Sequence, residues 1–230
     1  MPTIIELANV TKTYRLGGET LNALANVNLT IEAGDFVAIT GPSGSGKTTL
    51  ADIIGGLDRP TSGTVMVDGD DLARLHDAKL SAYRNKHIGF VFQSFNLQAT
   101  STALENVILP LVFQKVRPKE RKLRGIACLQ AVGLGDRIKH KPSQLSGGQR
   151  QRVAIARALA IKPSIIIADE PTGNLDSAKG QEIMGLLRDL NKQGITLIII
   201  THDQNIARQA SRQIEIHDGE LAERRSQHAL

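Results

Sequence analysis

The chain has little of the residue types that build disulfides, aromatic surfaces or membrane spans. Cys128 is its only cysteine, so an internal disulfide and a cysteine metal cage are both excluded. Aromatic residues make up 3% of the 230 residues, too few for the basic and aromatic surface that binds single-stranded nucleic acid. The longest apolar run, Ile195–Ile200, is far shorter than the roughly 20 residues that cross a bilayer, so no direct membrane insertion is expected.

Targeting segments and charge patterns give no sign of secretion or of nucleic acid binding. The first ten residues, MPTIIELANV, lack the basic start and apolar stretch of a secretory signal, so we expect a cytoplasmic chain. A formal net charge of +5 is compatible with contact to nucleic acid or acidic lipid. However, the densest basic run falls in a predicted helix and is typical of a solvated face, so no nucleic acid partner is expected. Its members are Arg117, Lys119, Arg121, Lys122 and Arg124.

The order of apolar runs predicts an α/β fold. Residues 4–31 are expected to form an antiparallel β unit with a turn at residues 16–19. The short apolar strand FVAIT then leads through a glycine-rich turn into TTLADIIGGL, whose apolar residues have helical spacing. Two later apolar runs, at 164–169 and 195–203, each follow a helical stretch, as in a parallel sheet covered by helices.

A mostly helical stretch interrupts this predicted core. Residues 94–159 contain no strong strand pattern. Helix breaks are predicted there at Pro110, Pro118 and Pro142. We therefore predict one domain, 1–230, in which 1–93 and 160–230 form the core with its antiparallel β subdomain, and the helical stretch is an inserted subdomain.

Residues 41–48 read GPSGSGKT, which matches the phosphate-binding loop GxxxxGK[ST] between a predicted strand and a predicted helix. Gly44 and Gly46 leave the backbone free to turn, so that successive N–H groups converge on a phosphate at the helix N-terminus. Lys47 is expected to reach the β- and γ-phosphates of a nucleotide, and the Thr48 hydroxyl to hold Mg²⁺. A plain Gly-Ser turn explains the glycines but not the Lys-Thr pair after them. The predicted nucleotide contacts in this phosphate loop are Gly41, Pro42, Ser43, Gly44, Ser45, Gly46, Lys47, Thr48 and Thr49.

Two adjacent carboxylates, Asp169 and Glu170, follow the apolar run IIIA. At the mouth of a buried strand they repel each other and lose hydration, which a divalent cation bound to one of them relieves. We assign Asp169 to Mg²⁺, through water, and Glu170 to the attacking water as general base. A second interpretation, in which Glu170 mainly orients and polarises that water, stays open. A turn at the strand end explains Asp169 alone but not the pair.

The string LSGGQ at Leu145–Gln149, followed by RQRVAIARALA, separates this chain from other phosphate-loop proteins. Ser146, Gly147 and Gly148 open a predicted helix whose free N–H groups and positive dipole end suit a γ-phosphate. A helix cap alone explains Ser-Gly-Gly but not the whole string ahead of Asp169. In these motifs the chain resembles the ABC ATPase family.

The resemblance implies a RecA-like P-loop NTPase core that binds ATP and Mg²⁺. It also implies that the signature of one subunit, residues 145–149, caps the ATP held by the phosphate loop of another subunit. Dimerisation is then part of the active site, with ATP favouring a closed head-to-tail homodimer and hydrolysis releasing it. The signature residues expected at the nucleotide are Ser146, Gly147, Gly148 and Gln149.

Four further positions match motifs of the family one by one. Gln93 resembles the Q-loop glutamine, which implies contact with Mg²⁺ and the attacking water and a role in sensing the membrane partner; a lone Gln after a strand is otherwise a loop residue. His202 resembles the switch histidine on the γ-phosphate, although strand-end histidines are commonly structural. Tyr14 resembles the aromatic residue that stacks on adenine. Asp176 matches the D-loop at the dimer interface and also suits an N-cap for a helix starting near Ser177. The expected catalytic residues are Lys47, Gln93, Glu170 and His202.

The stretches FVFQSFNLQATSTALENVILPL and ADEPTGNLDS resemble the subgroup that serves lipoprotein release, macrolide or antimicrobial-peptide efflux and cell-division transport. They imply an ATP-hydrolysing subunit that powers export or extrusion through a separate permease. Through that permease the subunit would lie at the inner face of the cell membrane. In that subgroup the stretch after FNL is more often apolar or proline-containing, whereas here it reads Gln98, Ala99, Thr100 and Ser101. The departure borders the groove that the resemblance implies for the coupling helix of the permease.

Two other functions fit parts of the same pattern. A non-transport ABC ATPase, associated with DNA repair or translation, shares the phosphate loop and the signature. Such proteins usually carry a long coiled coil between the two motifs or a second cassette, and this sequence has neither sustained heptads nor a motif repeat. A regulatory module with an inactive ATP site is opposed by the intact Lys47, Asp169, Glu170 and His202.

Overall fold

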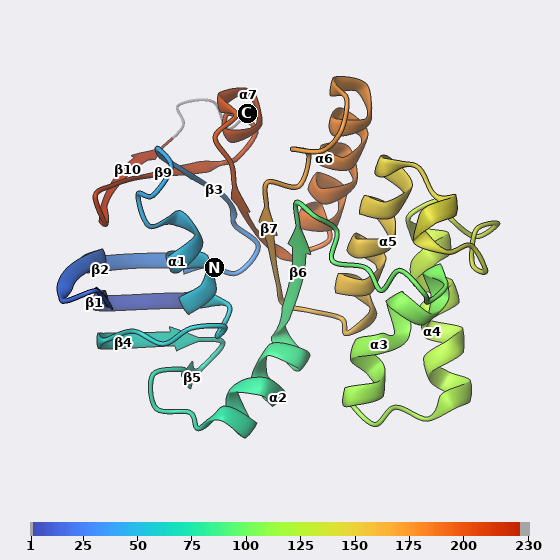
Figure 1. The fold of residues 1–230 in the computed structure, drawn as a ribbon, viewed down its shortest axis with the longest axis horizontal. Coiled ribbons are helices and arrows are strands. Elements are labelled where there is room, and N and C mark those ends of the chain that lie inside the picture. The colour runs from blue at the N-terminus through green and yellow to red at the C-terminus, as the bar shows by residue number, and fades with distance from the viewer. Residues whose placement is uncertain (1, 226–230) are drawn as a thin grey trace.

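The structure, a computed structural model, describes residues 2–225 and contains two β-sheets with helices packed around them (Figure 1). The strands are β1 (Thr3–Leu16), β2 (Glu19–Glu32), β3 (Phe36–Thr40), β4 (Ser62–Val67), β5 (Asp70–Asp71), β6 (Ile88–Phe92), β7 (Ile165–Asp169), β8 (Thr196–Ile200), β9 (Arg212–His217) and β10 (Glu220–Arg225). The helices are α1 (Lys47–Ile54), α2 (Asp77–His87), α3 (Ala103–Phe113), α4 (Pro118–Ala131), α5 (Gly147–Ala160), α6 (Ser177–Lys192) and α7 (Gln204–Ala207), with a short 3-10 helix at Pro142–Gln144. Within the described range, none of these helices has the length and apolar character to span a membrane.

The N-terminal part forms the antiparallel β unit that its sequence predicts. β1 and β2 pair around a turn at Gly17 and Gly18, and β4 and β5 complete a four-stranded sheet in the order β2-β1-β4-β5. Neither β4 nor the two-residue β5 was expected from the sequence. Both are short, and β4 pairs with a strand far away in the sequence, so local patterns carried little signal for them.

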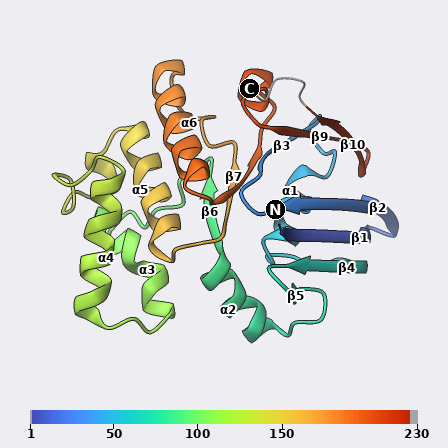
Figure 2. The same ribbon diagram turned by 180° about the vertical axis from the view of Figure 1, so that it is seen from behind.

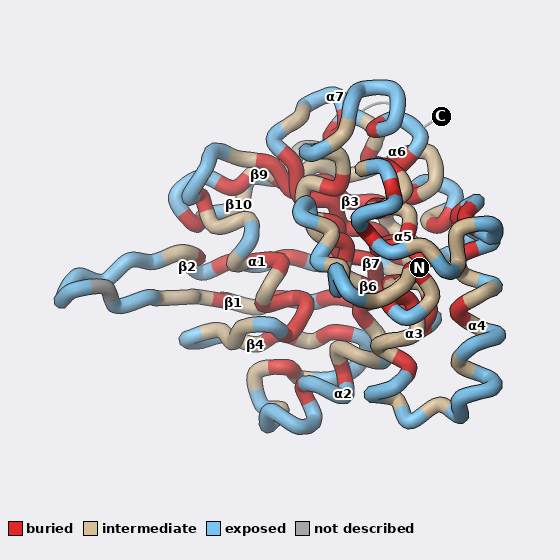
Figure 3. The backbone as a smooth tube through the Cα atoms, turned by 45° about the vertical axis from the view of Figure 1, so that its right-hand side comes forward, coloured by how far each residue is buried: buried red, intermediate tan, exposed pale blue. Residues whose placement is uncertain are grey.

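The second sheet has six strands in the order β10-β9-β3-β8-β7-β6, all parallel except β10. Its strands face two different cores, because successive side chains of a strand point to opposite sides. In β3, Val37 and Ile39 belong to the core shared with the four-stranded sheet, whereas Phe36 and Ala38 belong to the core under the helices. α1 contributes buried side chains to the first core, and Figure 3 shows the buried segments in the middle of the molecule.

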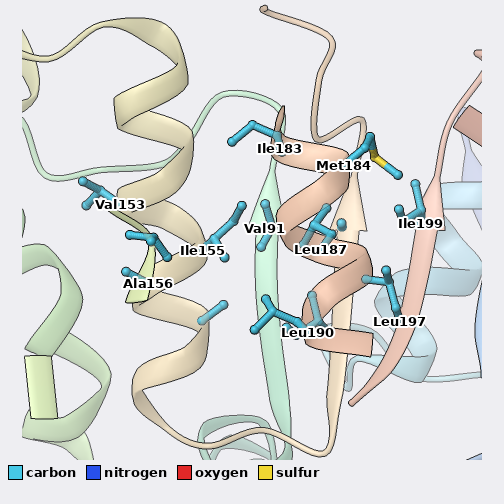
Figure 4. Packing of buried hydrophobic residues seen from close by; sticks show 14 of the residues in the cluster. Val91, Val153, Ile155, Ala156, Ile183, Met184, Leu187, Leu190, Leu197 and Ile199 are labelled. Atoms are coloured by element: carbon cyan, nitrogen blue, oxygen red, sulfur yellow. The ribbon is translucent and has the colours of Figure 1, made fainter. Parts of the chain in front are cut away.

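Helices α5 and α6 cover the other face of the six-stranded sheet (Figures 2 and 4). Met184 and Leu187 of α6 pack in one cluster with Leu197 and Ile199 of β8, and Ile155 of α5 belongs to the same cluster. All five side chains are buried. The packing fixes both helices to the sheet, so the loops that precede them have defined positions relative to the strand ends.

The predicted helical stretch, residues 94–159, contains α3, α4 and most of α5, and no strand is present there. α3 and α4 pack on each other and on α5, which in turn packs on the six-stranded sheet (Figure 1). This arrangement agrees with an α/β class that carries a helical insertion. The boundaries of the core and of the inserted subdomain stay a prediction.

Pro110 lies inside α3 and does not end it, so the predicted helix break at this position was wrong. The other two prolines behave as expected, since Pro118 and Pro142 each begin a helical segment. The ring of Pro110 removes one helical hydrogen bond. The last turn of α3 persists because Leu111 is fully buried and the Pro110 carbonyl still accepts the N–H of Gln114.

Replacing Leu187 by alanine is expected to destabilise the protein by about 2–5 kcal/mol, because it leaves a cavity in a packed core. Leu123→Ala is the matched control, since Leu123 is also helical but 62% exposed, and its effect should stay within about 0.5 kcal/mol. Urea unfolding followed by circular dichroism measures both variants. Equal unfolding midpoints would contradict the packing described for α6.

Candidate functional site

The predicted phosphate loop connects the carboxyl end of β3 to α1, at the edge where parallel α/β sheets bind ligands. Gly46 is the N-cap of α1 with a φ of 107°, and a Cβ there would overlap the carbonyl oxygen of Ala23 in β2. A Cβ at Gly41 would overlap the carbonyl oxygen of Ile216 in β9. Gly44 has a φ of 78° but open space around it. Close backbone contacts that only glycine permits thus hold the loop between the two sheets.

The start of α1 combines free backbone donors with a cation. The first N–H groups of a helix have no intrahelical partner and favour an anion. The Lys47 ammonium lies 2.9 Å from the carbonyl oxygen of Gly41 and 2.6 Å from that of Pro42, so it folds over the loop. The Ser45 hydroxyl is buried and has no hydrogen-bond partner among the described residues. These groups form a site suited to an anion, as the motif predicts.

Asp169 ends β7 in a partly buried position next to a second carboxylate. Burial first, and the charge of Glu170 second, raise the pKa of Asp169, while Lys47 opposes the increase. Asp52 of α1 is a further acidic residue that the sequence analysis missed, and burial, then Asp58 and Asp169, raise its pKa. Asp52 follows Thr48 of the phosphate loop by one helical turn, so both lie on one helix face, and this spacing could have indicated Asp52 from the sequence. The gathered negative charge favours a bound cation.

The predicted metal ligands suit Mg²⁺. Thr48, Gln93 and Asp169 offer a hydroxyl, an amide oxygen and a carboxylate, all of which are hard oxygen donors. No group of three or more His, Cys, Asp or Glu side chains forms a complete metal cage within residues 2–225. Mg²⁺ is usually held by one or two carboxylates together with substrate phosphates, so this sparse set of ligands fits the ion.

Glu170 and His202 are in direct contact. The Oε1 atom of Glu170 lies 2.6 Å from Nδ1 of His202 and accepts the His202 backbone N–H at 2.9 Å. The other carboxylate oxygen accepts the hydroxyl of the buried Thr201 at 3.3 Å. Glu170 has a left-handed φ of 45°, and its N–H bonds the Ile200 carbonyl at 2.9 Å. The structure thus joins two predicted catalytic residues and leaves Nε2 of His202 without a partner in the described part of the chain.

Gln93 follows β6 and lies against the loop after β7. The backbone carbonyl of Gln93 accepts a hydrogen bond from the Asn174 side-chain amide at 2.8 Å. A Cβ at Gly173 would overlap the side-chain amide of Gln93. The fully buried Gln151 of α5 donates to the Pro171 carbonyl of the same loop at 2.7 Å. Asn174 and Gln151 could not be assigned from local sequence patterns, because their partners lie 81 and 20 residues away along the chain. The two loops therefore form one unit that α5 supports.

The signature opens α5 through a complete capping box. Ser146 accepts the Gln149 N–H at 3.3 Å, and the Gln149 side chain accepts the Ser146 N–H at 2.9 Å. The helix itself begins at Gly147, so the cap interpretation holds in this structure. It is compatible with phosphate binding, because the following N–H groups at the start of α5 have no intrahelical partner.

The two helix starts suited to phosphate lie in different parts of the molecule. α1 belongs to the lobe that contains the four-stranded sheet, and α5 belongs to the helical lobe, with β6 and β7 between them (Figures 1 and 2). Within one chain, the phosphate loop and the signature thus belong to different parts of the fold.

Tyr14 lies beside the phosphate loop with 36% of its surface exposed. Its hydroxyl donates to Asp58 at 2.7 Å, and the Lys12 ammonium lies 4.9 Å from the ring centroid. Partial burial, followed by the hydrogen bond to Asp58, raises the pKa of Tyr14, while Thr49 of α1 opposes the increase. The ring is thus fixed in place near the start of α1 and remains partly exposed.

Asp176 is the N-cap of α6, as its position before Ser177 predicts. Its carboxylate accepts the Lys179 N–H at 3.0 Å and the Lys179 ammonium at 2.6 Å. Those bonds, led by the one from the side chain, lower the pKa of Asp176. The cap leaves the Asp176 side chain exposed at the start of α6.

A profile described as ABC transporter matches residues 24–173, which contain the phosphate loop, both carboxylates and the signature. The chain belongs to the ABC transporter family. YvrO of Bacillus subtilis, described as an uncharacterized ABC transporter ATP-binding protein, is 52% identical over 218 residues, which are 95% of this chain and 95% of YvrO. The macrolide export ATP-binding/permease protein MacB of Brucella melitensis is 50% identical over 218 residues, which are 95% of this chain but 34% of MacB.

The solved structure of MJ0796 from Methanocaldococcus jannaschii has the same fold. That ATP-binding cassette is described as a dimer in a post-hydrolysis state bound to ADP and Pi. It matches with a TM-score of 0.90 and 50% identity over 98% of this chain and 100% of that one. The match confirms the predicted P-loop NTPase fold, and MacB confirms the predicted subgroup. This chain is thus an ATPase domain of the ABC type.

The turn between β9 and β10 supports the phosphate loop from outside. Gly219 donates its N–H to the Ser45 carbonyl at 3.1 Å, and its own carbonyl accepts the N–H of Ala25 in β2 at 2.9 Å. The turn therefore joins the loop to the four-stranded sheet. An Asp-Gly pair between two strands is a hairpin signal that the sequence analysis left unused, so this support was missed.

Gly219→Ala is expected to weaken ATP binding roughly tenfold, because the added Cβ meets Ala23 and Leu24 at 3.1 Å and displaces the turn from Ser45. Gly69→Ala is the matched control, since Gly69 has a φ of 84° against 82° for Gly219 but open space around it. Titration with a fluorescent ATP analogue measures both affinities. The support is absent if the two variants bind equally well.

Proposed function

We propose that this chain is the ATP-binding and ATP-hydrolysing subunit of an ABC transporter and that it powers export or extrusion through a separate permease. The observation that carries the proposal is the placement of α1 and α5 in different lobes of one chain (Figure 1). A head-to-tail homodimer brings α1 of one chain and α5 of its partner onto each nucleotide. The dimeric assembly described for MJ0796 supports this arrangement.

Each proposed site binds ATP through groups of one chain before the partner closes on it. Tyr14 stacks on the adenine, the loop N–H groups surround the phosphates, and Lys47 leaves the loop carbonyls for the β- and γ-phosphates. The residues that would hold Mg²⁺ are Thr48, Gln93 and Asp169. When bound, this ion neutralises charge on the phosphate oxygens. The raised pKa of Asp169 reflects the same crowding of negative charge that a cation relieves.

Hydrolysis is assigned to the pair at the ends of β7 and β8. Glu170 orients the attacking water and takes its proton, while the bond from the γ-phosphorus to the bridging oxygen breaks and ADP leaves. His202 holds Glu170 through Nδ1 and has Nε2 available for the γ-phosphate. Because Thr201 contributes only one long bond to the second oxygen, that oxygen keeps capacity to accept the proton.

The signature of the partner completes the site. Ser146, Gly147, Gly148 and Gln149 present the free start of α5 to the γ-phosphate held by the other chain. ATP then stabilises the dimer by mass action, and loss of the γ-phosphate removes that stabilisation. Asp176, on its exposed loop, is proposed to cross the interface beside the nucleotide. The unit of function is thus two chains that share two ATP molecules.

An apolar groove of about 440 Å³ is the proposed docking site for the permease. It lies between β6 with its preceding helix α2 and the C-terminal half of α3, and Arg157 of α5 borders it. The apolar residues along it include Leu57, Phe90, Phe92, Leu109 and Phe113. Exposed apolar surface of this kind marks a site of protein interaction. Binding there holds the chain at the inner face of the membrane without insertion, and MacB, an ATP-binding/permease protein by name, supports such a partner.

The structure opposes the non-transport alternative. Between α1 and α5 the longest helix is α4, with 14 residues, so no coiled-coil arm projects from the described chain. Helices α3 and α4 instead pack back onto α5. A compact insertion beside an apolar groove fits a permease partner better than a DNA or ribosome partner.

Glu170→Gln is expected to keep ATP binding but to lower turnover at least about 100-fold, because the base is lost. With ATP and Mg²⁺ the variant should accumulate as a dimer, which light scattering on a sizing column detects. Glu182→Gln is the matched control and should turn over normally, since its surface pair with Arg152 contributes little. A variant that stays monomeric under these conditions refutes the shared site.

Ser146→Arg is expected to bind ATP with unchanged affinity but to lose at least about tenfold in turnover, because the long cation blocks approach of the partner's γ-phosphate. The lost cap also costs about 1 kcal/mol of stability, which a melting curve reports separately. Ser143→Arg, an equal change three residues earlier on an exposed position, should behave as wild type. Normal turnover of Ser146→Arg means that the signature only caps α5.

A further inference from the structure

The connection between α3 and α4 carries an unusual combination of cations and exposed apolar side chains. We name residues 112–123 the basic corner. Its cations are Lys115, Arg117, Lys119, Arg121 and Lys122, and its apolar residues with large exposure are Val112, Phe113 and Leu123. The sequence pattern alone predicted a solvated face for most of this run. The exposed apolar residues beside the charges point to a partner instead.

The five cations of the corner are free of ion pairs within the described chain. The only carboxylate in the corner, Glu120, is bound to Arg124 at 2.7 Å. Lys115, Arg117, Lys119 and Lys122 are exposed, and Arg121 is half-buried. The corner therefore presents an uncompensated positive field to its surroundings.

The apolar residues of the corner are a large share of those that the molecule exposes. Among the side chains whose exposure the structure describes, six large hydrophobic ones are exposed, and three of them lie here. Phe113 is 71% exposed, Leu123 is 62% exposed and Val112 is 43% exposed. On α4, Leu123 follows Lys119 at i, i+4 spacing, so these two side chains share a helix face. Lysine beside bulky apolar residues is the composition of surfaces that rest on a bilayer.

The position of the corner specifies which surface it meets. Phe113 belongs both to the corner and to the apolar groove, and the α3–α4 connection lies at the same edge of the molecule as α2 (Figures 1 and 2). The chain turns at Lys115, with a φ of 57°, between Phe113 at the groove and the start of α4. A permease segment in the groove thus brings the corner toward the membrane from which that segment emerges.

We propose that the basic corner contacts anionic phospholipid headgroups of the bilayer around the permease. The contact rests on the proposed function for its orientation, but its chemistry belongs to the corner alone. Each lysine or arginine near an acidic bilayer strengthens binding by roughly fivefold, and salt screens the attraction. Phe113 and Leu123 add apolar contact at the headgroup level without a span. The corner thereby helps to keep the subunit close to the permease when the dimer opens.

Flotation with lipid vesicles tests the contact without permease or nucleotide. The purified chain should bind vesicles of phosphatidylcholine with about one third phosphatidylglycerol far more than pure phosphatidylcholine, and about 0.5 M salt should release it. The triple variant Lys115→Gln, Lys119→Gln, Lys122→Gln should bind on the order of 100-fold more weakly. Its ATP turnover in solution should be unchanged, since none of the three residues touches the nucleotide site.

A matched triple variant controls for net charge. Lys139→Gln, Arg188→Gln and Arg208→Gln remove three exposed cations away from the corner and should bind acidic vesicles nearly as the wild type does. Equal binding by the two triple variants, or equal binding of the wild type to neutral and acidic vesicles, overturns the proposal. A second outcome also overturns the proposal: the wild type binds duplex DNA, only the corner variant loses that DNA binding, and the two triple variants bind vesicles equally well.

The outcomes separate this proposal from the proposed function. If Glu170→Gln dimerises with ATP but the wild type does not bind acidic vesicles, the lipid contact alone is refuted. If acidic vesicles bind through the corner while Glu170→Gln stays monomeric, the shared ATP site is refuted and the lipid contact stands.

Discussion

Close backbone packing around the phosphate loop is the constraint on which the rest of the structure depends. On one side Gly46 meets Ala23 of β2, and on the other side Gly41 meets Ile216 of β9, with no room for a Cβ at either glycine. β2 belongs to the four-stranded sheet and β9 to the six-stranded sheet, so the two sheets are fixed to each other at this loop. α1 starts there and contributes to the core between them. The phosphate donors are thus positioned by both sheets, which is why a loop rich in glycine and serine has one defined conformation.

Three carboxylates lie close together beside the phosphate loop, an arrangement that folding alone does not favour. Asp169 ends the buried β7, Glu170 follows it directly, and Asp52 adds a third carboxylate from α1. Burial and mutual repulsion raise the pKa of Asp169 and Asp52, with Lys47 as the opposing charge on Asp169. A fold selected for stability would place apolar or singly charged residues there. This cost is understandable where a cation is to be bound, because its positive charge then stabilises the poorly hydrated carboxylates.

Local motifs predicted the strands, loops and helices that carry the candidate site, but they did not predict contacts between distant residues. Lys47, Asp169 and the start of α5 could be assigned because strand, loop and helix follow one another within a few residues. Gly219 and Gln151 support the same loops from positions far away along the chain, and no local pattern links them to their partners. Pro110 shows the opposite failure, since a strong local signal for a helix break was overridden by burial of its neighbours. The limit of prediction therefore lies in tertiary contacts, which also decide short elements such as β4 and β5.

The support that α5 gives to both loops bears on how two shared sites can act together. Besides the bond from Gln151 to Pro171, Arg157 of α5 donates to the carbonyls of Phe95 and Asn96, which have left-handed φ values of 61° and 48°. In the proposed dimer the start of α5 binds the partner's ATP, while its body holds the Q-loop and the loop after Glu170 of its own chain. A shift of α5 on closure therefore moves groups at both sites, since a helix transmits displacement along its length. Asn96 and Arg157 also border the groove proposed for the permease, so in the proposed transporter α5 links that groove to the loops at the ATP site by hydrogen bonds.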